Sequence, residues 1–242
     1  YYIMGNGSNL LVGDKGFRGG IVQVFKQMSD VYADGERVYA QAGALLSKTA
    51  AVACEASLTG MEFASGIPGT LGGALRMNAG AYGGEMKQIV ESAEVLTSEG
   101  EVLNLTNEEL GMGYRTSVIA KNDYVALSAV LKLEKGDRQE IRAYMEDLKE
   151  RRVTKQPLEF GSAGSTFKRP EGYFAGKLIQ DSGMQGYRVG DAQVSEKHCG
   201  FVINRGNATA AEVMQLMKDV ADRVEEKFGV RLEPEVRRIG EF

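Results

Sequence analysis

The sequence predicts an α+β protein with a strand-rich first unit and a smaller α+β second unit. Within residues 1–135, apolar and polar residues alternate in short runs, and two intervening segments, 34–37 and 98–100, consist of turn-forming residues. Beyond residue 137, two segments repeat apolar residues at helical spacing. A chain of 242 residues is long enough for one large domain or two ordinary ones.

The elements of the first unit follow in order from these patterns. Alanine-rich residues 45–57 predict a helix, and the two turn segments each join a pair of strands into a hairpin. The strands are expected at residues 1–4, 21–25, 31–33, 38–40, 91–97, 101–105 and 124–134.

The second unit begins after a charged helix over residues 138–152, at a boundary near Lys155-Gln156-Pro157. A buried strand is expected at 200–204, and strand-like segments at 230–232 and 236–239. Thr209 and Glu212 form a capping-box pattern that starts a helix ending at Gly229. Two domains are therefore expected: residues 1–153, completed by 231–242, and residues 154–230.

Composition narrows the class of protein. The chain has a hydrophobic content of 43%, a charged content of 26% and a net charge of -4, which fit a globular protein. It contains no apolar run long enough to cross a membrane. It also contains no cluster of basic residues that would bind nucleic acid or an anionic membrane. Cys54, Cys199 and a single histidine form no disulfide framework and no familiar metal site, which predicts a reducing cytoplasmic compartment. Because the chain starts with Tyr1 inside a predicted strand, a preceding natural segment is expected to be missing.

Glycine-rich segments carry the strongest functional signal. Four of the nine residues in 65–73 are glycine and one is proline, and segments 78–83 and 5–10 have the same small, flexible character. Such residues let the backbone approach a ligand closely and point N–H groups at it. The region 65–83 and the loop 5–10 together indicate a clamp around a diphosphate, with two tight turns as the alternative.

Three short segments carry polar residues where folding alone does not require them. Arg115, between glycine and tyrosine, suits an anion or an enolate oxygen, or is a surface arginine. Ser165 lies among small residues without a hydrolase motif, so it is either a proton donor or a turn residue. Glu235, with Arg237 on the same face of a strand-like segment, is either an active-site carboxylate or part of a solvated edge. A lone histidine such as His198 is more often structural than a ligand.

Taken in order, these segments resemble the UDP-N-acetylenolpyruvoylglucosamine reductase family, in its shorter subtype, over nearly the whole chain. The resemblance implies a flavin-binding fold of the vanillyl-alcohol-oxidase (PCMH) type with a smaller substrate domain. It also implies that FAD, reduced by NADPH, reduces the enolpyruvyl group of a UDP-sugar in peptidoglycan precursor synthesis. The motifs are Gly5-Asn6-Gly7-Ser8-Asn9, Ser65 to Thr70, Asn78 to Gly83, Gly113 to Ser117, Gly164 to Pro170, Lys197 to Phe201 and Leu232 to Arg237.

The resemblance also assigns roles to residues. It implies that Arg115 and Glu235 act at the substrate carboxylate and that Ser165 delivers the proton. The implied substrate contacts are Tyr114, Lys155, Lys168, Arg169, His198 and Arg237. The implied FAD contacts are Gly5, Asn6, Gly7, Ser8, Asn9, Leu10, Ser65, Gly66, Ile67, Pro68, Gly69, Thr70, Gly72, Gly73, Asn78, Gly80, Ala81 and Tyr82.

Two other functions stay open from the residues. One is another FAD-dependent oxidoreductase of the same fold, and the other is a UDP-sugar-binding fragment without catalysis. The Ser165 and Glu235 segments lie outside the flavin loops and favour the reductase. No metal, nucleic acid, membrane insertion or obligate protein partner is expected.

Overall fold

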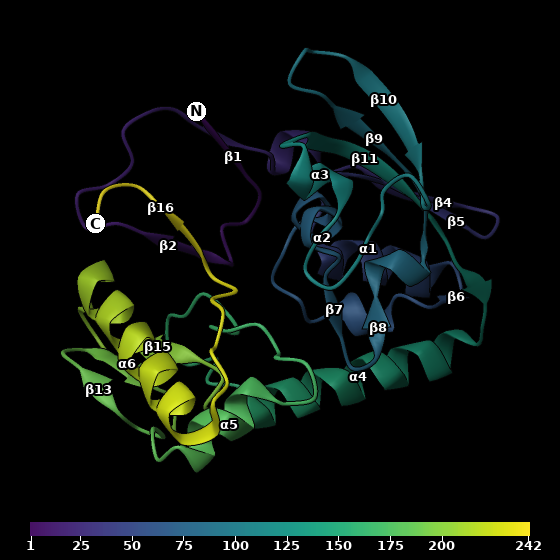
Figure 1. Cartoon of the computed structure of the whole chain (residues 1–242). Helices are drawn as coiled ribbons and strands as arrows, with labels where there is room; N and C mark the ends of the chain where they lie inside the picture. The colour runs from purple at the N-terminus through teal and green to yellow at the C-terminus, as the bar shows by residue number, and fades with distance from the viewer. The chain divides into compact units, whose positions relative to one another are not determined.

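The computed structural model describes all 242 residues and divides them into two compact units (Figure 1). The first unit comprises Tyr1–Gly7 and Gly20–Arg152, and the second comprises Ser8–Gly19 and Val153–Phe242. Each unit has its own cluster of buried apolar side chains. The chain therefore folds around two hydrophobic cores.

A five-stranded antiparallel sheet forms the centre of the first unit, in the order β10-β9-β11-β5-β4 (Figure 1). Both predicted hairpins are present, with Gly35 and Gly100 at positive φ in their turns. The positive φ explains why the turns need glycine. The strands are β4 (Val31–Asp34), β5 (Arg37–Gln41), β9 (Val90–Leu96), β10 (Val102–Thr106) and β11 (Val125–Lys132).

Two helices, α1 (Leu46–Glu55) and α2 (Leu71–Met77), pack against this sheet. Helix α2 lies inside the glycine-rich segment, where the sequence predicts only a loop. A Cβ atom at Gly72 would lie 3.0 Å from the Cβ of Ala42, so the glycine lets the helix approach the end of β5 closely. Close packing against the sheet thus stabilises a helix whose glycines disfavour it in isolation.

Short elements complete the first unit. The strand pairs are β1 (Tyr2–Met4) with β3 (Ile21–Gln23), β6 (Leu58–Thr59) with β12 (Glu134–Lys135), and β7 (Gly80–Ala81) with β8 (Gly84–Glu85). The remaining helices are α3 (Val118–Lys121), α4 (Arg138–Lys155) and the 3₁₀ turns at Lys26–Met28, Glu62–Ala64 and Met86–Gln88. Helix α4 extends three residues beyond the expected end at 152.

The second unit packs α6 (Ala210–Phe228) against a three-stranded antiparallel sheet. The predicted capping box is present: Thr209 Oγ1 accepts the N–H of Glu212 at 3.1 Å, and Glu212 accepts the N–H of Thr209 at 2.9 Å. The helix ends at Gly229, whose φ is 66°. The sheet strands are β13 (Arg188–Val189), β14 (Ala192–Val194) and β15 (Val202–Asn204), and a further helix is α5 (Ala175–Asp181).

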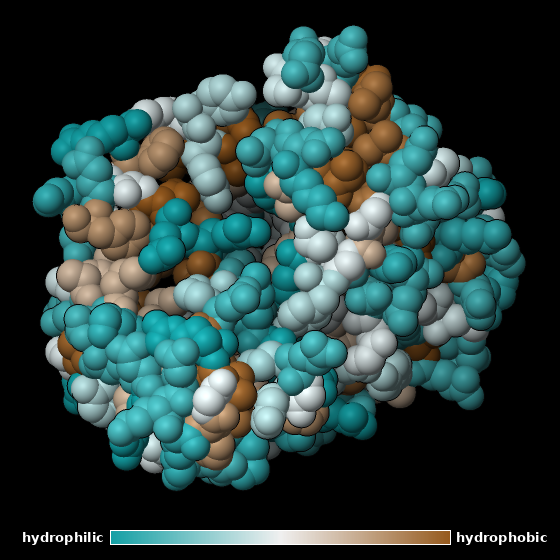
Figure 2. Space-filling model, viewed as in Figure 1, coloured by the Kyte–Doolittle hydropathy of each residue, from teal (hydrophilic) through white to brown (hydrophobic).

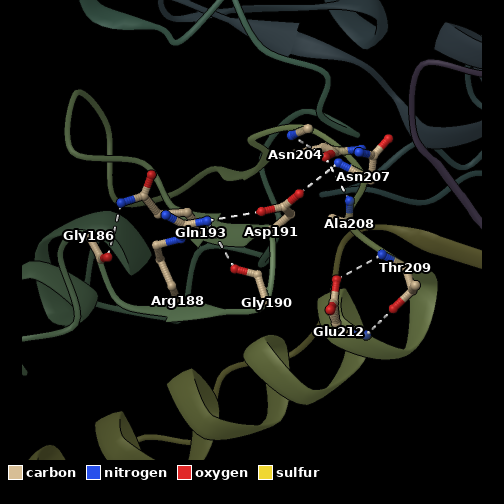
Figure 3. A network of polar contacts seen from close by, with 11 residues as sticks. Gly186, Arg188, Gly190, Asp191, Gln193, Asn204, Asn207, Ala208, Thr209 and Glu212 are labelled. Carbon is tan, nitrogen blue, oxygen red and sulfur yellow. Dashed lines mark hydrogen bonds and ion pairs between the residues drawn. The ribbon is translucent and has the colours of Figure 1, made fainter.

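A network of polar contacts fixes the loops that precede α6 (Figure 3). The Asp191 carboxylate accepts the N–H of Asn207 at 2.9 Å and pairs with Arg188 at 3.1 Å. The Asn204 side-chain oxygen accepts the N–H groups of Gly206 and Ala208. These bonds hold the turn between β13 and β14 beside the loop that leads into α6.

The C-terminal segment belongs to the second unit, whereas the sequence assigns residues 231–242 to the first. Strand β16 (Arg237–Ile239) pairs in parallel with β2 (Leu10–Val12), and both lie in the second unit. The expected strand at 230–232 is absent. Parallel pairing between strands more than 220 residues apart leaves no local signal in the sequence.

Polar residues cover most of the face shown in Figure 2, and apolar residues occur there in separate patches. None of the helices combines the length and the apolar character that a membrane crossing requires. Both cysteines are buried free thiols, and no cluster of three acidic, histidine or cysteine side chains could hold a metal ion.

Candidate active site

Two of the predicted flavin loops meet in the first unit. The Asn6 side chain donates to the carbonyl of Pro68 at 2.7 Å. A Cβ atom at Gly5 would overlap Oγ1 of Thr70, a residue that is 2% exposed. Loop 5–7 therefore reaches loop 68–70 only because position 5 lacks a side chain.

A cavity of about 80 Å³ opens beside these loops. Its lining includes Gly5, Thr70, Gly72 and Gly73 from the two loops and apolar residues such as Ile3. A cavity of this size could hold only part of a dinucleotide, and the glycines in its lining leave room for such a part to approach the backbone. The residues present thus fit an FAD site.

The third predicted flavin segment begins at Asn78, which ends α2 in the left-handed region with a φ of 46°. Its amide donates to Glu85 at 3.0 Å and to the carbonyl of Gly113 at 3.1 Å, and its oxygen accepts the N–H of Lys87 at 2.9 Å. The side chain of this buried residue is therefore used within the protein. The structure gives it a positioning role that joins segment 78–87 to the loop carrying Arg115.

Arg115 lies in a tight turn closed by two hydrogen bonds between Gly113 and Thr116, of 3.0 and 3.2 Å. Its φ is 54°, in the left-handed region that disfavours residues with a side chain. The guanidinium lies over the ring of Tyr114, 5.1 Å from the centroid. Backbone strain in such a residue is common at functional sites, where the surrounding structure maintains it.

Arg152, at the end of the charged helix α4, is a further candidate that the sequence analysis does not name. A Cβ atom at Gly66 would lie 2.8 Å from its Nε, and its guanidinium carbon lies 5.7 Å from the centre of the Tyr82 ring. Burial lowers the pKa of its guanidinium. Both contacts fall in predicted flavin loops, so this cation belongs to the same region of the first unit.

In the second unit, three segments come together around Ser165. Residue 165 lies opposite Phe201, and the N–H of Thr166 donates to the carbonyl of Gly200 at 2.8 Å. On the other side, the N–H of Glu235 donates to the carbonyl of Thr166, also at 2.8 Å. Two residues 70 positions apart in sequence, Ser165 and Glu235, thus lie on neighbouring segments.

Thr166 holds this junction together. It is 2% exposed, and its hydroxyl oxygen accepts the N–H of Val202 at 2.9 Å. Ser165 itself is exposed, so its hydroxyl is accessible while the backbone on either side is fixed. This arrangement suits a side chain that must meet a ligand in one position.

The first glycine-rich segment divides between the two units. Gly5, Asn6 and Gly7 lie in the first, whereas Ser8, Asn9 and Leu10 lie in the second. The Asn9 amide donates to the carbonyl of Glu235 at 3.1 Å, and Leu10 pairs with Arg237. The side chain of Asn9 therefore positions the Glu235 segment within the second unit.

Two predicted substrate cations have partners in the second unit. The Lys168 ammonium pairs with Glu233 at 2.9 Å, and the Arg169 guanidinium lies 3.9 Å from the centre of the Phe174 ring. Arg169 Nε also donates to the carbonyl of Tyr173 at 3.1 Å. These contacts are exposed, so a ligand could still compete for either cation.

The single histidine is half-buried and firmly placed. Its Nδ1 accepts the N–H of Gly200 at 3.1 Å, and its ring meets Phe201 edge to face at 5.0 Å. Burial lowers the pKa of His198, its own carbonyl opposes that effect, and the Lys155 ammonium reinforces it. The charge of Lys155 thus acts on His198 although the two residues lie 43 positions apart in sequence.

Comparison with known proteins covers both units. A family described as "FAD binding domain" matches residues 1–106, and one described as "UDP-N-acetylenolpyruvoylglucosamine reductase, C-terminal domain" matches residues 156–239. These matches confirm the predicted fold class.

Relatives match over the full chain. The UDP-N-acetylenolpyruvoylglucosamine reductase of Alkaliphilus oremlandii is 60% identical over 241 residues, covering 100% of this chain and 79% of the relative. That of Agathobacter rectalis is 55% identical, covering 99% and 80%. The crystal structure of the Thermus caldophilus enzyme superimposes with a TM-score of 0.85 at 36% identity, covering 99% of this chain and 85% of that one. The chain belongs to the UDP-N-acetylenolpyruvoylglucosamine reductase family.

Proposed function

We propose that this chain reduces UDP-N-acetylenolpyruvoylglucosamine to UDP-N-acetylmuramate, with electrons from NADPH, in peptidoglycan precursor synthesis. Members of its family are FAD-containing, NADPH-dependent oxidoreductases, and family membership supports the overall reaction. The observation that carries the residue assignment is the hydrogen bond from Glu235 to Thr166, which brings the candidate acid groups of the second unit together.

The first unit is proposed to hold the cofactor. The backbone of loops 5–7 and 65–73 and the segment around Tyr82 supply the contacts, with Arg152 beside them. FAD held by these residues would supply the chemistry of hydride transfer, from NADPH to the terminal vinyl carbon of the enolpyruvyl group. The second unit is proposed to bind the UDP-sugar, through Lys155, Lys168, Arg169, His198 and Arg237.

Arg115 is proposed to stabilise the charge that develops on the substrate. Hydride addition to the terminal carbon leaves negative charge on the adjacent carbon and on its carboxylate. A fixed guanidinium favours that charge more than it favours the starting substrate. Tyr114 keeps the guanidinium in place through its ring.

Ser165 is proposed to complete the reduction by giving its proton to the carbon next to the ether oxygen. The reduction thus forms two new C–H bonds, one with the hydride and one with this proton. The serine oxygen then regains a proton from solvent. Glu235 is proposed to act at the substrate carboxylate in its protonated or hydrogen-bonded form, because a bare carboxylate would repel the developing charge.

The proposal extends to the setting in which the enzyme works. We place it in the cytoplasm, without an obligate protein partner. Its two cysteines are free buried thiols, which suits a reducing compartment.

An anaerobic absorption experiment tests the function. The purified chain, loaded with FAD, should lose its visible flavin bands on addition of NADPH and regain them on addition of the enolpyruvyl UDP-sugar. Bands that return only with oxygen would point to a different flavin oxidoreductase. A chain that stays colourless with added FAD, yet binds the UDP-sugar, would be a binding module without catalysis.

A further inference from the structure

The five-stranded sheet of the first unit has a second face that the proposed function does not use. Ala93 and Ala129 are at most 2% exposed and belong to the core that also contains residues of α1 and α2. Because side chains alternate along a strand, Glu94 and Ser128 lie on the opposite face. A cavity of about 420 Å³ lies on that opposite face, across all five strands, and is called the outer cavity below. Its volume is in the range of cavities that bind small molecules.

The strand register places five polar residues of the outer cavity in one row. On β9, Glu94 lies between Asn104 on one side and Ser128 on the other. Ser128 lies opposite Gln41, and the N–H of Gln41 donates to the carbonyl of Asp30 at 2.9 Å. Neighbouring strands are about 4.8 Å apart, so the three steps from Asp30 to Glu94 span about 14 Å.

The outer cavity carries negative charge that no cation of the protein neutralises. Its lining contains two carboxylates, Asp30 and Glu94, and no lysine or arginine. Two cations of the same face, Arg37 and Lys132, lie opposite each other in another row, and Arg37 pairs with Glu91 at 3.0 Å. The row therefore ends in one unpaired carboxylate near each side of the sheet.

Hydrogen-bond acceptors lie between these two carboxylates. The Ser128 hydroxyl donates to Glu94 at 2.6 Å, which leaves the lone pairs of the serine oxygen for other donors. The side-chain oxygen of Gln41 accepts the N–H of Asp30 at 2.9 Å and has a second lone pair. A ligand with N–H groups between two cationic ends would find an acceptor along its whole length.

An aromatic pair stands beside the row. The rings of Tyr32 and Tyr39 stack across β4 and β5, with centroids 4.8 Å apart and planes 9° from parallel. Each tyrosine is two residues from a member of the row, Asp30 or Gln41, so it lies on the same face about 7 Å away. Tyr32 is 58% exposed. Aromatic rings attract cations and offer apolar surface to the methylene groups beside them.

We propose that the outer cavity binds a linear aliphatic polyamine. Its terminal ammonium groups pair with Asp30 and Glu94, its inner N–H groups donate to the oxygens of Gln41 and Ser128, and its methylene groups pack beside the tyrosine pair. Two carboxylates about 14 Å apart match a cation of this extended shape better than a compact metal ion. The site is separate from the flavin loops and adds a ligand that the reduction does not consume.

Isothermal titration calorimetry of the full chain, loaded with FAD and held at constant ionic strength, tests the site with spermidine as the probe. We expect saturable binding at a single site. Glu94→Gln and Asp30→Asn should each weaken binding about two- to fivefold, because each removes one exposed ion pair. These positions are far enough apart for their effects to multiply, so the double variant should bind about four- to twenty-five-fold more weakly. Glu108→Gln removes the same charge at an exposed position outside the cavity and should bind like the parent.

The length of the ligand supplies a second test. Propane-1,3-diamine and octane-1,8-diamine carry the same charge, but only the longer chain can reach both carboxylates at once. The longer diamine should bind the parent about two- to fivefold more tightly, and Glu94→Gln should remove most of this difference. A difference that persists unchanged in Glu94→Gln would contradict the bridging arrangement.

Other results would overturn the proposal outright. Equal weakening by Glu94→Gln and Glu108→Gln would show that spermidine responds only to net charge, and an absence of saturable binding would remove the site. Binding of an arginine-rich peptide by a chain that does not bind spermidine would make this face a protein-docking surface instead. None of these measurements uses turnover, so their outcome is independent of the reductase assay.

Discussion

Replacing Thr166 with valine removes one hydroxyl from the junction that places Ser165 and Glu235. Valine has nearly the same shape, and the backbone bonds of residue 166 to Gly200 and Glu235 remain. The N–H of Val202 loses its 2.9 Å acceptor in a place where both residues are buried. A buried donor left without a partner costs about 1–3 kcal/mol of unfolding free energy.

The magnitude can be measured by thermal unfolding. A loss of 1 kcal/mol lowers the Tm of a chain of this size by about 2–4 °C, so the variant should unfold roughly 2–12 °C below the parent. The reaction should change selectively: reduction of the flavin by NADPH stays normal, and its reoxidation by the UDP-sugar slows because Ser165 is less well held. Thr166→Ser keeps the hydroxyl and serves as the matched control. Identical unfolding of the valine and serine variants would refute the role given to this hydrogen bond.

Three further outcomes are expected. Ser165→Ala should leave flavin reduction by NADPH unchanged and slow reoxidation by the UDP-sugar about 10²- to 10⁴-fold; normal rates in both half-reactions would remove Ser165 as proton donor. Gly5→Ala should weaken FAD binding about ten- to a hundredfold in a fluorescence titration, because the methyl group overlaps Thr70, whereas Gly20→Ala, with open space around it, should bind FAD normally. Because the pKa of His198 is lowered on folding, the unfolded chain takes up its proton first as the pH falls, so stability decreases below the unfolded value of about 6.5; urea midpoints should fall more in the parent than in His198→Gln as the pH is lowered, and parallel curves would contradict this.

Local chemistry in the sequence determined much of the fold. Asp34-Gly35 and Ser98-Glu99-Gly100 are typical turn sequences, and apolar and polar residues alternate on both sides of each. The structure contains the two hairpins that this pattern predicts. Thr209 and Glu212 define the start of α6 through side-chain bonds to nearby N–H groups, and Gly229 defines its end. These features depend on residues within a few positions of one another, so they can be predicted from the local sequence alone.

Ordered motifs determined the family, and with it the cofactor and the reaction. The glycine-rich loops, the Ser165 segment and the Glu235 segment occur in an order that resembles the family, and the matches over both units confirm the resemblance. The individual assignments of Arg115, Ser165 and Glu235 stay predictions until their variants are measured.

Tertiary structure alone decided how these residues are supported. Helix α2 forms within a glycine-rich segment because β5 packs closely against it, and Asn9 bonds to Glu235 from a distant part of the chain. Arg152 reaches Gly66 and Tyr82 from the end of a helix that reads as solvent-exposed. Nδ1 of His198 accepts the N–H of Gly200, and burial together with the charge of Lys155 lowers the pKa of the ring. The sequence contains the reactive groups, but long-range packing and hydrogen bonding determine which side chains hold them in place.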